Sequence, residues 1–173
     1  MKLKPGDRAP DFSAETAHHG GLELSDFAND TLLLQFYRFA GCPVCNLSLR
    51  TYAKRHADLA GAGIWVVAVF HSGAASLREH VRVKVLPFPL LADPDKTIYQ
   101  RYGVESSVAA MRSPKVIGKA LRAVSLGYLP GKVEGGGNGL PADFLIEQGV
   151  VRHAHYGTHA ADTLSVDEAL KLL

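Results

Sequence analysis

The chain carries little net charge. Its 19 Lys and Arg residues nearly balance 17 Asp and Glu residues, which leaves a formal charge of +2 when the eight His residues are neutral. Nucleic acids and anionic membranes are bound by concentrated basic surfaces. We therefore expect neither as a partner, and favour a small-molecule or protein substrate.

Long hydrophobic runs are also missing. The longest, "IWVVAVF" from Ile64, is far shorter than the ~20 residues that span a bilayer. The first residues, "MKLKPGDRAPDF", lack the apolar segment of a secretory signal. We therefore expect a cytoplasmic protein, and the length of 173 residues is typical of a single domain covering 1–173.

Cysteine is scarce: the chain has only Cys42 and Cys45, with Pro43 between them. In a reducing compartment such a pair seldom forms a structural disulfide, and redox chemistry or metal binding is its usual purpose. Two thiols that merely fill the core are an alternative. Zinc would need four ligands, and the nearest candidates, His153, His155 and His159, are distant in sequence and lack a second Cys-x-x-Cys. We expect neither a metal nor another cofactor.

Two apolar runs rich in branched and aromatic residues, "TLLLQFY" from Thr31 and "IWVVAVF" from Ile64, are typical of strands buried on both faces. The mixed stretch 46–59 between them predicts a helix that ends at "AGAG" from Ala60. A strand, a helix and a second strand in this order indicate a parallel pair.

Further helix starts are indicated by capping patterns. Ser76 with Glu79 fits a capping box ahead of "LREHVRVKV", and Ser165 with Glu168 fits one before "ALKLL". Asp93 is predicted to be an N-cap, with the following proline as the first helical residue.

Ser113 and Pro114 predict the start of an amphipathic helix. Its apolar stripe consists of Val116, Ile117, Ala120, Leu121 and Val124. Its basic face consists of Lys115, Lys119 and Arg122.

A glycine-rich loop, "LPGKVEGGGNGLP" from Leu129, precedes a predicted hairpin that turns at Gln148 and Gly149. Strand alternation then places His153 and His155 on the same side. The complete order predicts an α/β protein of thioredoxin-like fold, with a central mixed sheet flanked by helices; another α/β sandwich remains an alternative.

The spacing Cys-x-x-Cys between a strand and a helix lets both sulfurs approach bonding distance. The free N–H groups and the dipole of a helix N-terminus stabilise a thiolate. Pro43 suits the first helical position because its φ is fixed and its missing N–H would have had no helical partner. Arg38, four residues before Cys42, could add a positive charge and hydrogen-bond donors, unless it only solvates the strand end.

Four further segments carry a resemblance when taken in this order: "LKPGDRAPDFSAETAHHGGLELSDF", "LLLQFYRFAGCPVC", "LPFPLLADPDKTIYQRYGV" and "LPADFLIEQGVV". Together they resemble the peroxiredoxin superfamily (AhpC/TSA type), and within it the subgroup with a Cys-Pro-x-Cys active site. The resemblance implies the thioredoxin-like fold with an N-terminal hairpin and the reduction of hydroperoxides.

The family pattern Pro-x-x-x-Thr-x-x-Cys, laid on "RFAGCPVC", implies that Cys45 attacks the peroxide. Arg38 then replaces the family's proline, and Cys42 replaces its threonine. Pro141 stands where other members have an arginine, as in thioredoxins, which implies a cis bond after Leu140.

Four residues are candidates for substrate binding: Pro43, Tyr37, Phe39 and Pro141. Tyr37 and Phe39 flank Arg38 and are expected to wall the thiol pocket, although strand alternation would place at least one of them in the core.

Two chemistries remain open. In a peroxidase, Cys45 becomes a sulfenic acid and Cys42 condenses with it; in a disulfide reductase or isomerase, Cys42 attacks a substrate disulfide and Cys45 resolves the product. Both end in a Cys42–Cys45 disulfide that an external thiol such as thioredoxin or glutathione must reduce. A non-catalytic, redox-regulated interaction module is a third alternative. Family members often pair, so a homodimer is among the expected assemblies.

Overall fold

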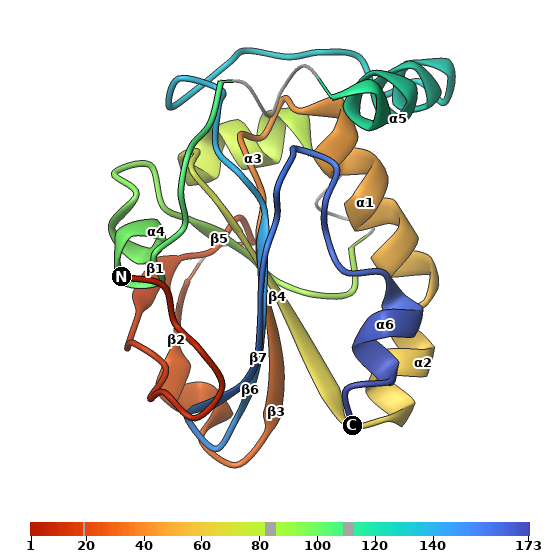
Figure 1. Cartoon of the computed structure of the whole chain (residues 1–173). Helices are drawn as coiled ribbons and strands as arrows, with labels where there is room; N and C mark the ends of the chain where they lie inside the picture. Colours follow the sequence, from red (N-terminus) through yellow and green to blue (C-terminus); the bar gives the residue numbers. More distant parts are fainter. Residues whose placement is uncertain (19, 82–85, 109–112) are drawn as a thin grey trace.

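A five-stranded mixed sheet with helices on both sides forms the centre of the molecule (Figure 1). The computed structural model describes residues 1–18, 20–81, 86–108 and 113–173. The described strands are β1 (Ser13–Glu15), β2 (Gly21–Glu23), β3 (Thr31–Phe36), β4 (Ile64–Phe70), β5 (Leu90–Ala92), β6 (Ala142–Glu147) and β7 (Val150–Tyr156). The described helices are η1 (Leu24–Phe27), α1 (Pro43–Lys54), α2 (His56–Gly61), α3 (Ala74–His80), α4 (Thr97–Arg101), α5 (Pro114–Ser125) and α6 (Val166–Leu170).

The sheet has the order β5-β4-β3-β6-β7. Strands β3, β4 and β5 are parallel, whereas β6 is antiparallel to β3 and β7 is antiparallel to β6. The predicted parallel pair is therefore confirmed, as is the N-terminal hairpin, which is formed by β1 and β2. The helix between β3 and β4 is interrupted at Arg55, so that it forms two segments, α1 and α2.

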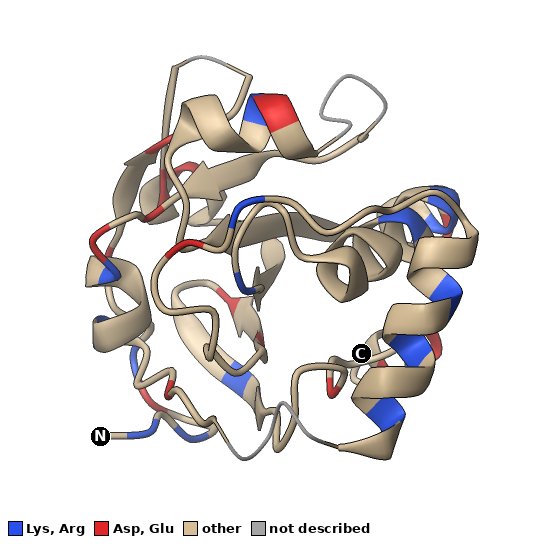
Figure 2. Ribbon diagram, turned by 90° about the horizontal axis from the view of Figure 1, so that it is seen from above, with Lys and Arg blue, Asp and Glu red and all other residues tan. Residues whose placement is uncertain are grey.

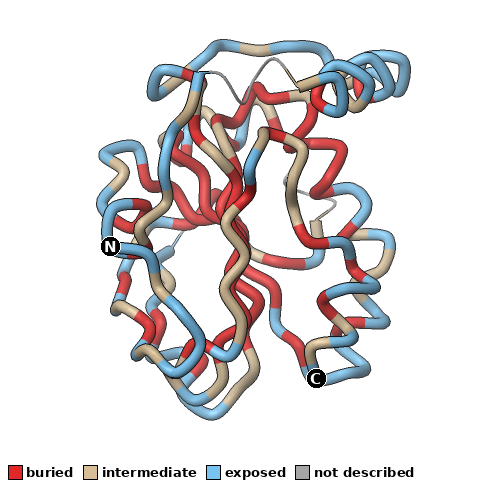
Figure 3. The backbone as a smooth tube through the Cα atoms, in the orientation of Figure 1, coloured by how far each residue is buried: buried red, intermediate tan, exposed pale blue. Residues whose placement is uncertain are grey.

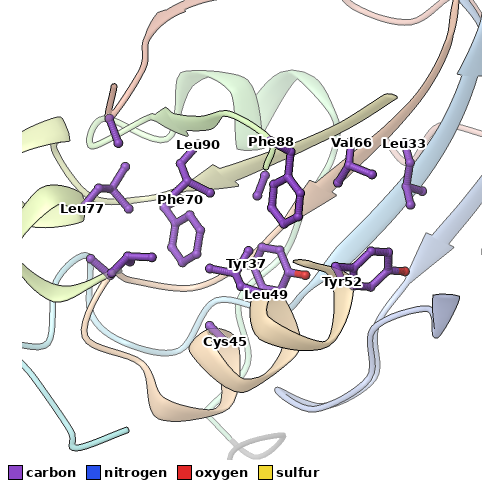
Figure 4. Packing of buried hydrophobic residues seen from close by; sticks show 14 of the residues in the cluster. Leu33, Tyr37, Cys45, Leu49, Tyr52, Val66, Phe70, Leu77, Phe88 and Leu90 are labelled. Atoms are coloured by element: carbon purple, nitrogen blue, oxygen red, sulfur yellow. The ribbon is translucent and has the colours of Figure 1, made fainter. Parts of the chain in front are cut away.

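Alternate residues of the central strands supply two hydrophobic cores, one on each face of the sheet. Figure 3 shows that these strands are buried where they run through the centre of the molecule. Leu33 and Val66 point to the face covered by α1, α3 and α6, whereas Leu34 and Val67 point to the face covered by the N-terminal segment and α4. Figure 4 shows the first of these cores, with Cys45 reaching into it from α1. The strands are buried on both faces, which explains their nearly continuous apolar sequences.

The hairpin turn is confirmed at Gln148 and Gly149, with φ angles of 51° and 76°. Two consecutive positive φ angles are typical of a type I′ turn, which matches the twist of the flanking strands. His153 and His155 line the same surface pocket, as alternation predicts.

Two predicted helix starts are wrong. Helix α3 begins at Ala74 after Gly73, so Ser76 lies within it and donates a hydrogen bond to Glu134 instead of capping. The end of the predicted helix, 82–85, lies outside the described residues. Helix α4 begins at Thr97, because Lys96 occupies the N-cap with φ 58°.

Asp93 nevertheless caps the N-terminus of α4, although it lies outside the helix. Its carboxylate accepts the N–H groups of Thr97, Ile98 and Tyr99 at 2.9, 2.8 and 3.1 Å. The predicted capping box of Ser165 and Glu168 is present at the start of α6.

Helix α5 begins at Pro114 as predicted, but its apolar stripe only partly meets the core. Val116 is buried, whereas the side chains of Ile117 and Leu121 are 54% and 67% exposed. The blue positions along α5 in Figure 2 mark its basic residues. One of these, Lys119, turns toward α1 and donates to Ser48 Oγ at 2.8 Å.

Within the part of the chain that the structure describes, no helix is both long and apolar enough to cross a membrane.

Candidate active site

The two thiols lie between the end of β3 and the first turn of α1. Cys42 is the N-cap residue of α1, with extended backbone angles (φ −79°, ψ 115°), and Pro43 is the first helical residue. Cys45 follows within the first turn, and both cysteines are free thiols. The sequence folds this way because the apolar strand ends at Phe36 and Pro43 favours a helix start.

Asn46, which no sequence motif marks, fixes the shape of this turn. Its Nδ2 atom donates to the carbonyl oxygens of Ala40 at 2.8 Å and Cys42 at 3.0 Å. The Asn46 backbone N–H also donates to the Cys42 carbonyl, at 3.1 Å. The side chain is buried, so the turn depends on these bonds rather than on solvent.

The thiols are neighbours and both are buried. Cys42 is 0% and Cys45 is 3% exposed. A hydrogen-bonding interaction between the two side chains affects the pKa of each thiol. The two thiols are thus close enough for each to influence the acidity of the other.

Arg38 lies beside the first thiol. Its Nη1 atom is 3.6 Å from Cys42 Sγ, and its Nη2 atom donates to the Gly137 carbonyl oxygen. The guanidinium carbon lies 5.1 Å from the centroid of the Phe39 ring, within reach of a cation–π interaction. Arg38 therefore lies against the first thiol and the glycine-rich loop rather than only solvating the strand end.

The two thiols have opposite acidities. The hydrogen bond from Cys45 is the largest influence on Cys42; burial opposes it, Arg38 reinforces it, and the pKa of Cys42 is lowered to about 7. Burial raises the pKa of Cys45 well above its ordinary value, and the hydrogen bond to Cys42 raises it further. The arrangement therefore favours a thiolate on Cys42 and a protonated Cys45.

The glycine-rich loop that begins at Leu129 packs against the residues beside the thiols. In Figure 1 the segment after α5 crosses the top of the molecule before it enters β6. Gly131 packs on Gly41, next to Cys42, and its N–H donates to the Gly41 carbonyl at 2.9 Å. A Cβ atom on Gly41 would lie 2.7 Å from backbone atoms of Gly131, so glycine is required for this close approach.

Side chains from three other parts of the chain hold the loop down. Glu134 accepts hydrogen bonds from Ser72 and Ser76, the latter at 3.0 Å. Lys96 Nζ donates to the Gly135 carbonyl at 2.7 Å. With Arg38 at Gly137, these bonds close the loop over the site.

Two of the predicted substrate-binding residues have clear packing roles. Tyr37 is buried in the core, stacked on Phe70 with ring centroids 5.3 Å apart, and its hydroxyl donates to Gln35 Oε1 at 3.2 Å. Phe39 is also buried, and its ring packs against the Arg38 guanidinium and near Gly137.

The predicted cis bond before Pro141 is wrong: no peptide bond among the described residues is cis. Leu140 and Pro141 continue directly into β6, and the extended strand is compatible with the trans form. The Leu140 N–H donates to Glu105, and the Pro141 carbonyl accepts the N–H of Gly157 at 2.8 Å.

His71 is a further residue of the site that the sequence patterns did not indicate. It follows β4, and its backbone N–H donates to the Arg38 carbonyl at 3.1 Å. Its side chain is 1% exposed. A lone histidine after an apolar strand has no distinguishing sequence signal, because only the fold places it beside Arg38.

No group of three or more His, Cys, Asp or Glu side chains among the described residues is arranged to hold a metal ion.

Comparison with known proteins places the chain in a family. The sequence model of the AhpC/TSA family matches residues 5–154. The chain belongs to this family. Peroxiredoxin Bcp of Escherichia coli (strain K12) is 29% identical over 102 residues, which cover 59% of this chain and 65% of that protein. The alignment thus spans less than two thirds of that relative.

Solved structures extend the similarity over nearly the whole chain. Peroxidoxin BcpB from Mycobacterium tuberculosis matches with a TM-score of 0.72 and 19% identity, covering 98% of this chain and 96% of that one. A protein from Chlorobium tepidum described as a thiol:disulfide interchange protein, DsbE, matches with a TM-score of 0.62 and 24% identity, covering 98% and 94%. These similarities confirm the predicted fold.

Proposed function

We propose that this protein is a dithiol peroxidase that reduces hydroperoxides with Cys42, Cys45 and Arg38. The observation that carries the proposal is the placement of two free thiols at a helix start, with Cys42 Sγ 3.6 Å from Arg38 Nη1. It provides a nucleophile with a lowered pKa and, next to it, a protonated thiol that can complete the disulfide. Membership in the AhpC/TSA family and the peroxiredoxin relatives support the same activity.

In the first step, the Cys42 thiolate attacks one oxygen of the hydroperoxide and the O–O bond breaks. Cys42 becomes a sulfenic acid, and the alkoxide or hydroxide that leaves takes up a proton. Cys45 then attacks the Cys42 sulfur: an S–S bond forms, the S–O bond breaks, and the thiol proton leaves with hydroxide as water. Two electrons have moved from the thiol pair to the peroxide.

This order differs from the one implied by the family pattern, which assigns the attack to Cys45. The direction of the two pKa shifts favours Cys42, because the thiolate is the reactive form and burial keeps Cys45 protonated. Phe39 and Pro43 remain proposed neighbours of the substrate. Tyr37 and Pro141 would affect substrate binding only indirectly, by packing against the residues around the site.

The cycle closes when an external thiol such as thioredoxin or glutathione reduces the disulfide. Because Cys42 is fully buried, we infer that the glycine-rich loop moves aside to admit a substrate or a reductant. We place the cycle in the cytoplasm, where such thiols are maintained in the reduced state.

The test is rapid mixing of the reduced protein with hydrogen peroxide and with an organic hydroperoxide. We expect oxidation much faster than that of free cysteine. In Cys45→Ser the sulfenic acid should accumulate on Cys42, whereas Cys42→Ser should react slowly; mass spectrometry identifies the oxidised residue. A wild-type rate equal to that of free cysteine would refute the proposal, and sulfenic acid on Cys45 alone would reverse the order of attack.

One observation also favours disulfide reduction as a second function: the first cysteine of the pair has the lowered pKa, as that chemistry requires. If the protein is a disulfide reductase, it should turn over a model disulfide with an external dithiol, and Cys42→Ser should abolish this turnover. Peroxide consumption should then be negligible. If neither the peroxide nor the disulfide is turned over, the remaining alternative is a non-catalytic, redox-regulated interaction module.

A further inference from the structure

His71 and Arg38 meet at the ends of two parallel strands. His71 directly follows β4, Arg38 follows β3, and the backbone bond between them fixes their spacing. The carboxyl ends of parallel strands are where α/β proteins commonly bind ligands. Arg38 Nη1 lies 3.6 Å from Cys42 Sγ, so His71 is bonded through its backbone to the residue that contacts the thiol.

The imidazole ring lies in a closed compartment. The rings of Phe39 and Tyr99 form two walls, with centroids 6.3 and 5.6 Å from that of His71. The glycine-rich loop forms the cover: a Cβ on Gly135 would collide with Nδ1, and one on Gly139 would lie 3.7 Å from Nε2. Glycine at position 135 therefore allows the loop backbone to lie directly against the imidazole ring.

Three buried nitrogen atoms in this compartment lack hydrogen-bond partners among the described residues. They are Nδ1 and Nε2 of His71 and Nε of Arg38. Buried polar atoms are almost always paired, and an unpaired one costs about 1–3 kcal/mol. Three such atoms next to a reactive thiol indicate that a ligand completes the set.

The charge state of His71 defines which ligand fits. Burial is the main cause that lowers the pKa of His71, to about 4, and the positive charges of Lys96 and Arg38 lower it as well, while Glu134 opposes them. At neutral pH the ring is uncharged, so one nitrogen donates and the other accepts. Together with the Arg38 Nε–H, the compartment offers two donors and one acceptor.

A hydroperoxide group matches this set. Its two oxygens accept hydrogen bonds and its O–H donates one, whereas a carboxylate or a disulfide has no proton for the free imidazole nitrogen at neutral pH. We propose that His71 is a substrate-binding residue that accepts the hydrogen bond of the hydroperoxide O–H, while Arg38 donates to the peroxide oxygens. This inference rests on the proposed peroxidase function.

The test compares two reactions of the same thiols. In His71→Leu we expect the rate constant for oxidation by hydrogen peroxide to fall about tenfold to a hundredfold, since a hydrogen bond to the substrate is lost. The rate of exchange with the aromatic disulfide DTNB, which cannot use the acceptor, should change less than twofold. His71→Gln, whose amide keeps one donor and one acceptor, should recover most of the peroxide rate.

His56→Leu is the matched control. The His56 ring packs near Phe88, with ring centroids 6.2 Å apart, and is not among the residues of the site. The substitution should leave both rates unchanged. An unchanged peroxide rate in His71→Leu, or an equal fall in both rates, would overturn the role of His71. A wild-type protein that reacts no faster than free cysteine would instead overturn the peroxidase function. The constant DTNB rate shows that the thiols remain folded and reactive in each variant.

Discussion

The Nη1 atom of Arg38 lies 3.6 Å from the Sγ atom of Cys42, at the start of α1. A fixed positive charge at this distance favours the thiolate, and with the Cys45 hydrogen bond it lowers the pKa of Cys42 to about 7. Below that pH the thiol is protonated and unreactive; above it the thiolate predominates. Alkylation of Cys42 by iodoacetamide should therefore rise with pH and level off above about 7.

Arg38→Met should move the midpoint of this alkylation profile to higher pH, because a stabilising charge is lost. The substitution also frees Gly137 of the loop, so the plateau rate is expected to rise while the midpoint shifts; the two effects are separable. Arg122→Met removes the same charge from an exposed position on α5 and should leave the midpoint in place. An unchanged midpoint in Arg38→Met would contradict the electrostatic role.

The hydrogen bond from Cys45 is the largest influence on the acidity of Cys42. Cys45→Ala removes the donor and should raise the Cys42 pKa, whereas Cys45→Ser keeps an O–H donor and should raise it less. Thiolate absorbance in the ultraviolet, followed against pH, measures both. Identical titrations of the Ala and Ser variants would show that the hydrogen bond does not set the acidity.

Asn46 should contribute to stability through the turn that it holds. Asn46→Ala leaves the carbonyl of Ala40 without its side-chain donor, and we expect a loss of about 1–3 kcal/mol in the free energy of unfolding. Urea denaturation of the reduced protein measures this value. Asn29→Ala, at an exposed position, should change stability by no more than about 0.5 kcal/mol. Equal effects of the two substitutions would show that the Asn46 hydrogen bonds do not stabilise the turn.

Sequence patterns predicted the elements whose signals are local. β3 and β4 are apolar runs because both faces of the sheet are covered. The turn at Gln148 and Gly149 is marked by Gly149, which adopts a positive φ without steric cost. The cysteine pair at the start of α1 was predictable for the same reason, because Pro43 and the preceding strand define the helix start locally.

The errors arise where distant segments decide the structure. Ser76 has the sequence of a cap, yet Glu134 of the loop takes its hydroxyl hydrogen bond. Asp93 caps α4 from several residues away because Lys96 adopts a left-handed conformation that no pattern predicts. His71 belongs to the site only because β4 lies beside β3, and this pairing brings together residues more than thirty positions apart.

The contact between Gly41 and Gly131 gives a direct test of the cover over the thiols. Gly41→Ala places a methyl group 2.7 Å from backbone atoms of Gly131, which cannot move without the loop. We expect a loss of about 1–3 kcal/mol in the free energy of unfolding and a severalfold faster alkylation of Cys42. Gly118→Ala is the matched control: it lies within α5 with no atom within 4 Å of the new methyl group, so stability should rise by about 0.5–1 kcal/mol with alkylation unchanged. If Gly41→Ala loses stability while Cys42 reacts at the wild-type rate, the loop does not control access to the thiol, because the same displacement that weakens the fold should have uncovered the sulfur.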